Sequence, residues 1–258
     1  MHDFGRIETI SSNGHTVTIA PDLGFAIVSW RWNDREILAM ETRDRFLQAR
    51  KGLGPLILPH FNQAGPIPEV DVTSFAHVDH LRAAGVDHPF QHGIGRYVPW
   101  TTRSTPTSIV GEISGTDMLG RYSLRDLTGF DFSALVRYRV RGNTMSVHLS
   151  VSGERPVAAG THFYLSFAGA ASADVFLPDW AGEAVRTVTH DAAVDQAFHV
   201  KPSEQSRIAH SAIRTAGYRV DVSFPVGARP AHAFDSLIVY SPRDASFACV
   251  EPISYPVF

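Results

Sequence analysis

The sequence has 258 residues, 44% of them hydrophobic and 19% charged, which is typical of a globular protein with a sizeable core rather than of a disordered chain. Its formal charge of −3 gives no electrostatic reason to bind nucleic acid or an anionic membrane surface, so we expect neither partner. Cys249 is the single cysteine, which excludes an intrachain disulfide. The first residues lack the basic start and apolar segment of a secretory signal, and no apolar run has the length of a membrane span, so we expect a cytoplasmic protein.

Strand patterns dominate from the start of the chain. Residues 15–20 alternate polar and apolar side chains, and residues 25–32 are rich in β-branched and aromatic side chains. Asn33-Asp34 predicts a turn into the apolar segment that follows. The N-terminal region therefore reads as consecutive antiparallel strands.

A short helix and a long hairpin follow. Residues 74–84 begin at a residue that can cap a helix and end before Gly85, which predicts a short helix. From Leu135 to Val151 apolar and polar residues alternate around Gly142-Asn143, the pattern of a hairpin with one wet face. Further strands are expected at 163–167, 218–224, 236–240 and 246–250. No repeat or linker interrupts the chain, so the sequence predicts one all-β domain over residues 1–258, a large antiparallel β-sandwich with few short helices.

Two ionisable residues stand beside predicted strands. His162 precedes an aromatic strand, and Glu251 follows an apolar one, where Pro252 is expected to end the pairing. A carboxylate in apolar surroundings and a histidine can exchange protons with a ligand near neutral pH. Taken alone, Glu251 fits an ordinary solvated strand end better than a catalytic base, and His162 fits a structural histidine better than a catalytic acid.

Six segments occur in an order that resembles one known family. They read, in chain order, VTIAPDLGFAIVSWRWNDREIL, GPLILPHFNQAG, HGIGRYVPW, GTHFYLSF, AVDQAF and FACVEP. Together they resemble the opening strands and the sugar-binding segments of the aldose 1-epimerase (galactose mutarotase-like) family. The resemblance implies a galactose mutarotase-like supersandwich that acts on an aldose and needs no cofactor.

The resemblance also assigns roles. Glu251 aligns with the general base that takes the proton from the anomeric hydroxyl, and His162 with the general acid that protonates the ring oxygen. Ring opening, bond rotation and reclosure then give the other anomer of the sugar substrate. The residues expected to bind this substrate are His92, Asp195, Asn62, Gln63 and Arg96, with Trp180 as an aromatic surface for the sugar. We expect His92, His162, Asp195 and Glu251 to open onto one cleft.

Two departures from the family keep other functions open. Gln63 stands where many family members carry arginine, and the sequence ends at Phe258, where they continue with closing strands. We therefore expect another segment or a second subunit of a homo-oligomer to cover the sheet edge near the end of the chain. The alternative functions are a non-catalytic carbohydrate-binding protein and an enzyme of different chemistry, such as a lyase, on the same fold.

Two further hypotheses concern ligand chemistry. A metal site would draw on the closely spaced His77, His80, His88 and His92, although their spacing matches no strong metal motif. A phosphorylated sugar would need converging basic side chains, for which the candidates are Arg50, Lys51, Arg96 and Arg103. The site that the resemblance assigns contains no metal ligand.

Overall fold

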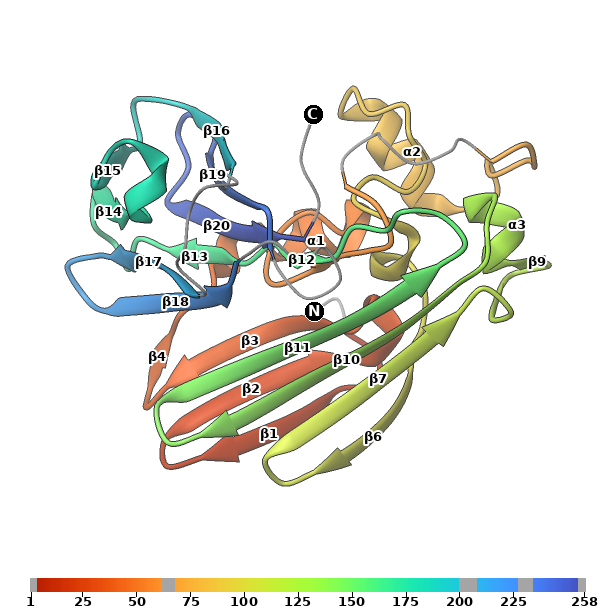
Figure 1. Ribbon diagram of the computed structural model, residues 1–258, viewed down its shortest axis with the longest axis horizontal. Coiled ribbons are helices and arrows are strands. Elements are labelled where there is room, and N and C mark those ends of the chain that lie inside the picture. Colours follow the sequence, from red (N-terminus) through yellow and green to blue (C-terminus); the bar gives the residue numbers. More distant parts are fainter. Residues whose placement is uncertain (1–3, 62–67, 200–207, 227–233, 255–258) are drawn as a thin grey trace. The chain divides into compact units, whose positions relative to one another are not determined.

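The computed structural model describes residues 4–61, 68–199, 208–226 and 234–254. The chain forms two compact units (Figure 1). Unit 1 comprises Met1–Glu36 and Met40–Ala159, and unit 2 comprises Ile37–Ala39 and Gly160–Phe258. Whether the two units act as one domain, as the sequence predicts, stays a prediction.

Unit 1 contains two antiparallel four-stranded sheets. One has the order β1-β2-β3-β4 and the other β11-β10-β7-β6. The strands are β1 Glu8–Ser12, β2 His15–Ala20, β3 Ala26–Trp32, β4 Arg35–Glu36, β6 Thr101–Thr105, β7 Ser108–Ser114, β10 Phe132–Arg141 and β11 Thr144–Gly153. Strands β1 and β2 pack on β10, so this unit is a sandwich of two sheets (Figure 1).

The core of unit 1 follows from the two-residue period of its strands. On β10 every second residue from Phe132 to Val140 is buried, and the residues between them are exposed or half-buried. The Phe25 ring lies 5.3 Å from the Trp100 ring and 5.1 Å from the Tyr138 ring, measured between centroids. Gly111 permits this packing, because a Cβ there would come within 2.8 Å of the Phe25 ring.

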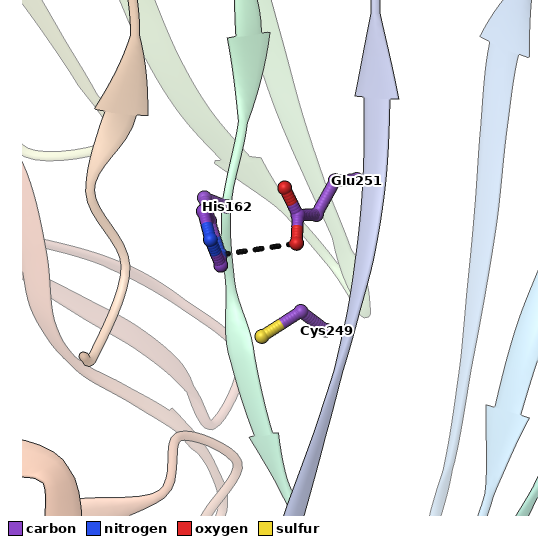
Figure 2. A group of neighbouring side chains, drawn as sticks. All are labelled: His162, Cys249 and Glu251. Atoms are coloured by element: carbon purple, nitrogen blue, oxygen red, sulfur yellow. Dashed lines mark ion pairs between the residues drawn. The ribbon is translucent and has the colours of Figure 1, made fainter. Parts of the chain in front are cut away.

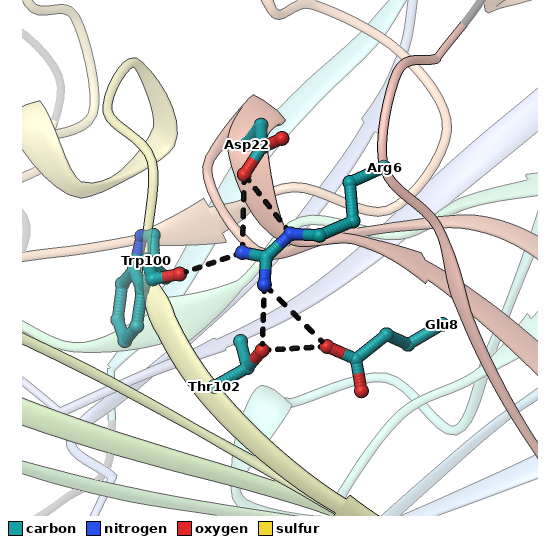
Figure 3. Close-up of polar contacts among 5 residues, drawn as sticks. All are labelled: Arg6, Glu8, Asp22, Trp100 and Thr102. Carbon is teal, nitrogen blue, oxygen red and sulfur yellow. Dashed lines mark hydrogen bonds and ion pairs between the residues drawn. The ribbon is translucent and has the colours of Figure 1, made fainter.

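A polar network ties the N-terminal segment to the rest of unit 1 (Figure 3). Arg6 donates two hydrogen bonds to Asp22 Oδ1, at 3.2 and 3.0 Å, and one to the Trp100 carbonyl at 3.0 Å. It also donates to Thr102 Oγ1, which in turn donates to Glu8 Oε1 at 2.5 Å. One guanidinium group thereby connects β1, the turn after β2 and the start of β6.

Short elements complete unit 1. They are η1 Pro21–Leu23, η2 Met40–Thr42, α1 Arg43–Ala49, β5 Leu56–Ile57, α2 Ala76–Ala83, η3 Ile94–Arg96, β8 Met118–Leu119, β9 Tyr122–Ser123 and α3 Leu124–Thr128. Helix α3 begins at a capping box, in which the Ser123 hydroxyl and the Asp126 carboxylate each accept a hydrogen bond from the other residue's backbone N–H. Among the described residues, no helix is both long and apolar enough to cross a membrane.

Unit 2 contains two further antiparallel sheets. One runs β16-β19-β20-β12, with β13 also pairing with β20, and the other runs β15-β14-β17-β18. The elements are β12 Gly160–Thr161, β13 Tyr164–Ser166, β14 Ser172–Phe176, η4 Asp179–Ala181, β15 Val185–Thr189, β16 Val194–His199, β17 Ile208–Arg214, β18 Arg219–Pro225, β19 Ser236–Ser241 and β20 Phe247–Ile253. Strand β20 is buried along its whole length, as expected of a strand with neighbours on both sides.

Most predicted elements are confirmed. The structure contains the N-terminal strands, the helix at Ala76–Ala83 and the hairpin of β10 and β11, whose turn uses Gly142 at a φ of +57°. The all-β class with few short helices is also confirmed.

One local prediction is wrong: Pro252 does not end a strand. It lies inside β20, in register with Leu237 of β19, and pairing continues to Ile253. An antiparallel strand uses the N–H groups of alternate residues toward each neighbour. On the side of β12 and β13, the described pairs involve Ile253 and Cys249, and Pro252 lies between these two paired positions. The N–H group that proline lacks is therefore not needed for a hydrogen bond between the strands. Glu251 is therefore a residue of a buried strand.

Candidate active site

The register of unit 2 places His162 opposite Glu251. Gly160 of β12 pairs with Ile253, and Tyr164 of β13 pairs with Cys249. Both pairs fit one continuous register, and His162 lies midway between Gly160 and Tyr164 as Glu251 lies midway between Ile253 and Cys249. Directly opposite residues of antiparallel strands project from the same face, with Cβ atoms about 4.5–5.5 Å apart. The fold therefore makes these two residues a cross-strand pair.

The two side chains approach each other in a buried setting (Figure 2). His162 Nδ1 lies 3.4 Å from Glu251 Oε1, and their side chains are 6% and 2% exposed. The imidazole stacks on the Tyr164 ring with 4.7 Å between centroids and an interplanar angle of 4°, and the Tyr240 ring meets it edge-on at 6.2 Å. These aromatic contacts fix the plane of the imidazole beside the carboxylate.

Cys249 is the third chemically active side chain of this cluster (Figure 2). It precedes Glu251 by two residues on β20, so both side chains project from the same face. One ligand atom each from His162, Cys249 and Glu251 lies within 4.8 Å of the other two. Cys249 is buried and belongs to a core cluster with Ala39, Tyr164, Ala245 and Phe247. Its place beside the histidine was not predicted from the sequence.

Asp195 shares this face of the sheet. It pairs with Tyr240 of β19, which pairs with Cys249, so the three residues form one row across the strands. Ala197, Ile238, Glu251 and His162 form the neighbouring row. Asp195 is exposed on β16. The face thus passes from solvent at β16 to the buried pair at β20, with Asp195 about 10 Å from the β20 strand, two strand spacings.

His199 is a second polar residue on this face that the sequence analysis missed. It pairs with Ser236, and its Nδ1 lies 3.0 Å from the Ser236 hydroxyl. The two-residue spacing of Asp195, Ala197 and His199 along β16 was the signal that they share a face. Tyr240 was missed as well, since only the register reveals that it stands between Asp195 and Cys249.

His92 and Arg96 belong to unit 1. His92 has a φ of +63°, an unfavourable conformation for a residue with a side chain, and such positions concentrate at functional sites. Its ring contacts Phe61 at 5.1 Å between centroids. Arg96 is 1% exposed and donates from Nε to the Leu56 carbonyl at 3.0 Å, a contact that orders the backbone. Their roles toward a sugar stay predictions, as does the shared cleft.

The other predicted binding residues have different outcomes. Asn62 and Gln63 lie outside the described residues. Trp180 lies in η4 and is 5% exposed, so most of its indole packs inside unit 2. Its contact with a ligand stays a prediction.

The four basic residues considered for a phosphate also lie in unit 1. Arg50 donates to the carbonyls of Phe46 and Leu47, and Arg103 forms an exposed ion pair with Glu112. Burial, and then the charges of Arg45 and Arg96, lower the pKa of Lys51 to about 8. A phosphorylated substrate remains a hypothesis.

The histidines between residues 77 and 92 do not form a metal-ligand group in the described part of the chain. His77 Nε2 lies 3.0 Å from the Pro89 carbonyl, and His88 Nδ1 accepts a hydrogen bond from the Phe90 N–H. His77 and His80 instead line, with Arg50, a cavity of about 450 Å³ beside α1 and α2. His77 and His88 thus contact the backbone, and His77 and His80 line a cavity, so the close spacing of these histidines in the sequence does not reflect a shared metal site.

Comparison with known proteins assigns the fold. No family model matches the chain, and no curated protein matches it significantly. Among solved structures, the chain is similar to the Slr1438 protein of Synechocystis sp. PCC 6803, with a TM-score of 0.67, 15% identity, and 97% of this chain and 86% of that chain covered.

Two other solved structures carry descriptions that bear on the fold. A galactose mutarotase-like protein from Lactobacillus casei ATCC 334 matches with a TM-score of 0.65 and 14% identity over 96% of this chain and 87% of that one. Galactose 1-epimerase from Lactobacillus acidophilus NCFM matches with a TM-score of 0.57 and 10% identity over 100% and 89%. The chain therefore has a galactose mutarotase-like fold, as the sequence resemblance predicted.

Proposed function

We propose that the protein is an aldose 1-epimerase, which interconverts the α and β anomers of an aldose or aldose phosphate. The observation that carries the proposal is the buried cross-strand pair of His162 and Glu251, 3.4 Å apart, on a galactose mutarotase-like fold. The sequence resemblance assigns the acid and base roles to these same two residues.

The chemistry requires an acid and a base on one sugar ring. Glu251, ionised, takes the proton from the anomeric hydroxyl while His162, protonated, gives a proton to the ring oxygen. The C1–O5 bond breaks, and the open-chain aldehyde rotates about C1–C2. Reclosure reverses both proton transfers and restores both residues, so the reaction consumes no external acid, base or electron carrier. Each positioned group typically contributes about 10²–10⁴-fold.

Asp195 supports the proposal as a binding residue. A carboxylate accepts hydrogen bonds from sugar hydroxyls, and Asp195 is exposed on the same face as the buried pair. A sugar bound over Tyr240 would have the reactive pair at one end and the Asp195 carboxylate at the other. In this arrangement, Asp195 orients the substrate without exchanging a proton with it.

The proposal is tested by anomer exchange measured by NMR on a panel of free and phosphorylated aldoses. The expected result is acceleration of exchange for at least one sugar at catalytic protein concentrations. Binding of a sugar without acceleration of its anomer exchange would reject the enzymatic function and favour a non-catalytic carbohydrate-binding protein. The panel also separates free from phosphorylated substrates.

A further inference from the structure

His162, Cys249 and Glu251 together offer an imidazole, a thiol and a carboxylate in one buried cluster (Figure 2). These three groups are the ordinary ligands of zinc in proteins. The acid–base mechanism uses only two of them and gives the thiol no role. The combination of thiol and imidazole also favours a soft or borderline ion over magnesium or calcium, which prefer oxygen ligands.

We propose that this cluster is a three-ligand binding site for Zn²⁺, in which the bound ion blocks the acid–base pair. The binding part of the proposal stands on the cluster itself, whereas the inhibitory part rests on the proposed function. The site would hold the ion through His162, Glu251 and Cys249 and leave one position for water or an exogenous ligand, as open zinc sites do.

The geometry of the pair fits the ion. With zinc-to-nitrogen and zinc-to-oxygen bonds of about 2.0–2.1 Å at tetrahedral angles, the two ligand atoms would stand about 3.3–3.4 Å apart. His162 Nδ1 and Glu251 Oε1 are separated by 3.4 Å. The sulfur of Cys249 is within 4.8 Å of a ligand atom of each. With a zinc-to-sulfur bond of about 2.3 Å, the sulfur would stand about 3.5 Å from each of the other two ligand atoms, so it would have to move closer by no more than about 1.3 Å, within reach of a side-chain adjustment.

The strands supply the rigidity that such a site needs. Glu251 and Cys249 project from the same face of β20, and Tyr164, which stacks on His162, pairs with Cys249 in the sheet. Ligands held on paired strands keep their separation better than ligands on loops do. A bound ion would engage both the carboxylate and the imidazole, so neither could exchange a proton with a sugar.

The binding test uses full-length, untagged protein stripped of metal by a chelator. Zn²⁺ is titrated in competition with a chromophoric chelator, and Co²⁺ serves as a spectroscopic probe. We expect one equivalent of tight Zn²⁺ binding and a thiolate-to-cobalt charge-transfer band in the near ultraviolet. Cys249→Ser should abolish the band and weaken Zn²⁺ binding by at least the 10–100-fold that loss of a supporting group typically costs. His210→Asn, at an exposed histidine, is the matched control and should bind as wild type does.

The outcomes separate the two parts of the proposal. Absence of the thiolate band from cobalt-loaded wild-type protein, or equal zinc affinity for wild type and Cys249→Ser, would overturn the metal site. Wild-type spectra keep this test valid even where a variant folds poorly. If the protein catalyses anomer exchange, Zn²⁺ should inhibit the wild-type enzyme much more strongly than Cys249→Ser. Equal inhibition of the two proteins would overturn the proposal that the bound ion blocks the acid–base pair. If no exchange occurs at all, the proposed function fails while the zinc titration still decides the site.

Discussion

His162 and Glu251 face each other across neighbouring strands, with Nδ1 and Oε1 3.4 Å apart, although they come from opposite ends of unit 2. The contact depends on two pairings, Gly160 with Ile253 and Tyr164 with Cys249. A shift of either strand by one residue would turn one of the two side chains to the opposite face of the sheet. The register of β12, β13 and β20 therefore determines whether the proposed acid and base can act together.

Asp195→Asn tests the proposed binding role. We expect KM to rise by about 10–100-fold with little change in kcat, because a hydrogen bond to a charged group contributes about 1.5–3 kcal/mol to binding. Loss of uniform binding changes KM alone. Steady-state kinetics of anomer exchange provides the measurement, and Asp191→Asn, at an exposed residue outside β16, is the control. An equal fall in kcat would mean that Asp195 acts in the chemical step instead.

Gly93→Ala should destabilise unit 1 strongly. Gly93 has a φ of +95°, and a Cβ there would stand 1.8 Å from the Leu58 carbonyl oxygen. Gly142, at a φ of +57°, has nothing within 4 Å of the same position and provides a matched control. We expect Gly142→Ala to lower the free energy of unfolding by about 1–2 kcal/mol from backbone strain alone. Gly93→Ala should cost more than about 3 kcal/mol because the backbone must also move. If urea denaturation gave similar losses in the free energy of unfolding for both variants, the backbone around Leu58 would have to move aside without a penalty, which would contradict this prediction.

Stability should depend on pH through His60. Burial, and then the charge of neighbouring His88, lower the pKa of His60 from 6.5 to about 4. Above the unfolded-state pKa of about 6.5 the residue is neutral in both states. As the pH falls from about 6.5 to 4, the unfolded chain takes up a proton that the folded protein excludes, so stability falls. The full effect of this pKa difference is about 3 kcal/mol.

His60→Gln isolates this contribution, since glutamine can still donate to the Phe90 carbonyl that His60 contacts at 3.0 Å. The free energy of unfolding of the variant, relative to wild type, should rise as the pH falls through this window. His80→Gln, at an exposed histidine, is the control for loss of an imidazole elsewhere in unit 1. A difference between His60→Gln and wild type that stays constant with pH would contradict the assignment.

The sequence predicted the parts of the fold that depend on local pattern. The alternation around Gly142-Asn143 identified the β10–β11 hairpin, because a half-buried strand needs a two-residue period. Pro252 is the exception, because a proline stops a strand only where its missing N–H would have a partner, and that depends on the neighbouring strand. The division into two units was not predicted, since contacts between distant segments define it.

The candidate site was predictable only through resemblance. Motif order pointed to His162 and Glu251, but their opposition across the sheet follows from pairings between segments far apart in the chain. Cys249 illustrates the limit. Its two-residue spacing from Glu251 was visible in the sequence, whereas its proximity to His162 required the register.

The central claim is tested most directly by polarimetry on wild type and Glu251→Gln with a sugar that responds. Glutamine keeps the size and hydrogen bonding of the side chain but cannot accept the proton. Glu112→Gln, at a solvent-facing strand residue, controls for loss of a carboxylate elsewhere. We predict that wild type and Glu112→Gln accelerate mutarotation and that folded Glu251→Gln loses about 10²–10⁴-fold in kcat. Full activity of Glu251→Gln would contradict the mechanism, and a wild-type rate equal to the spontaneous one for every aldose and aldose phosphate would contradict the function itself.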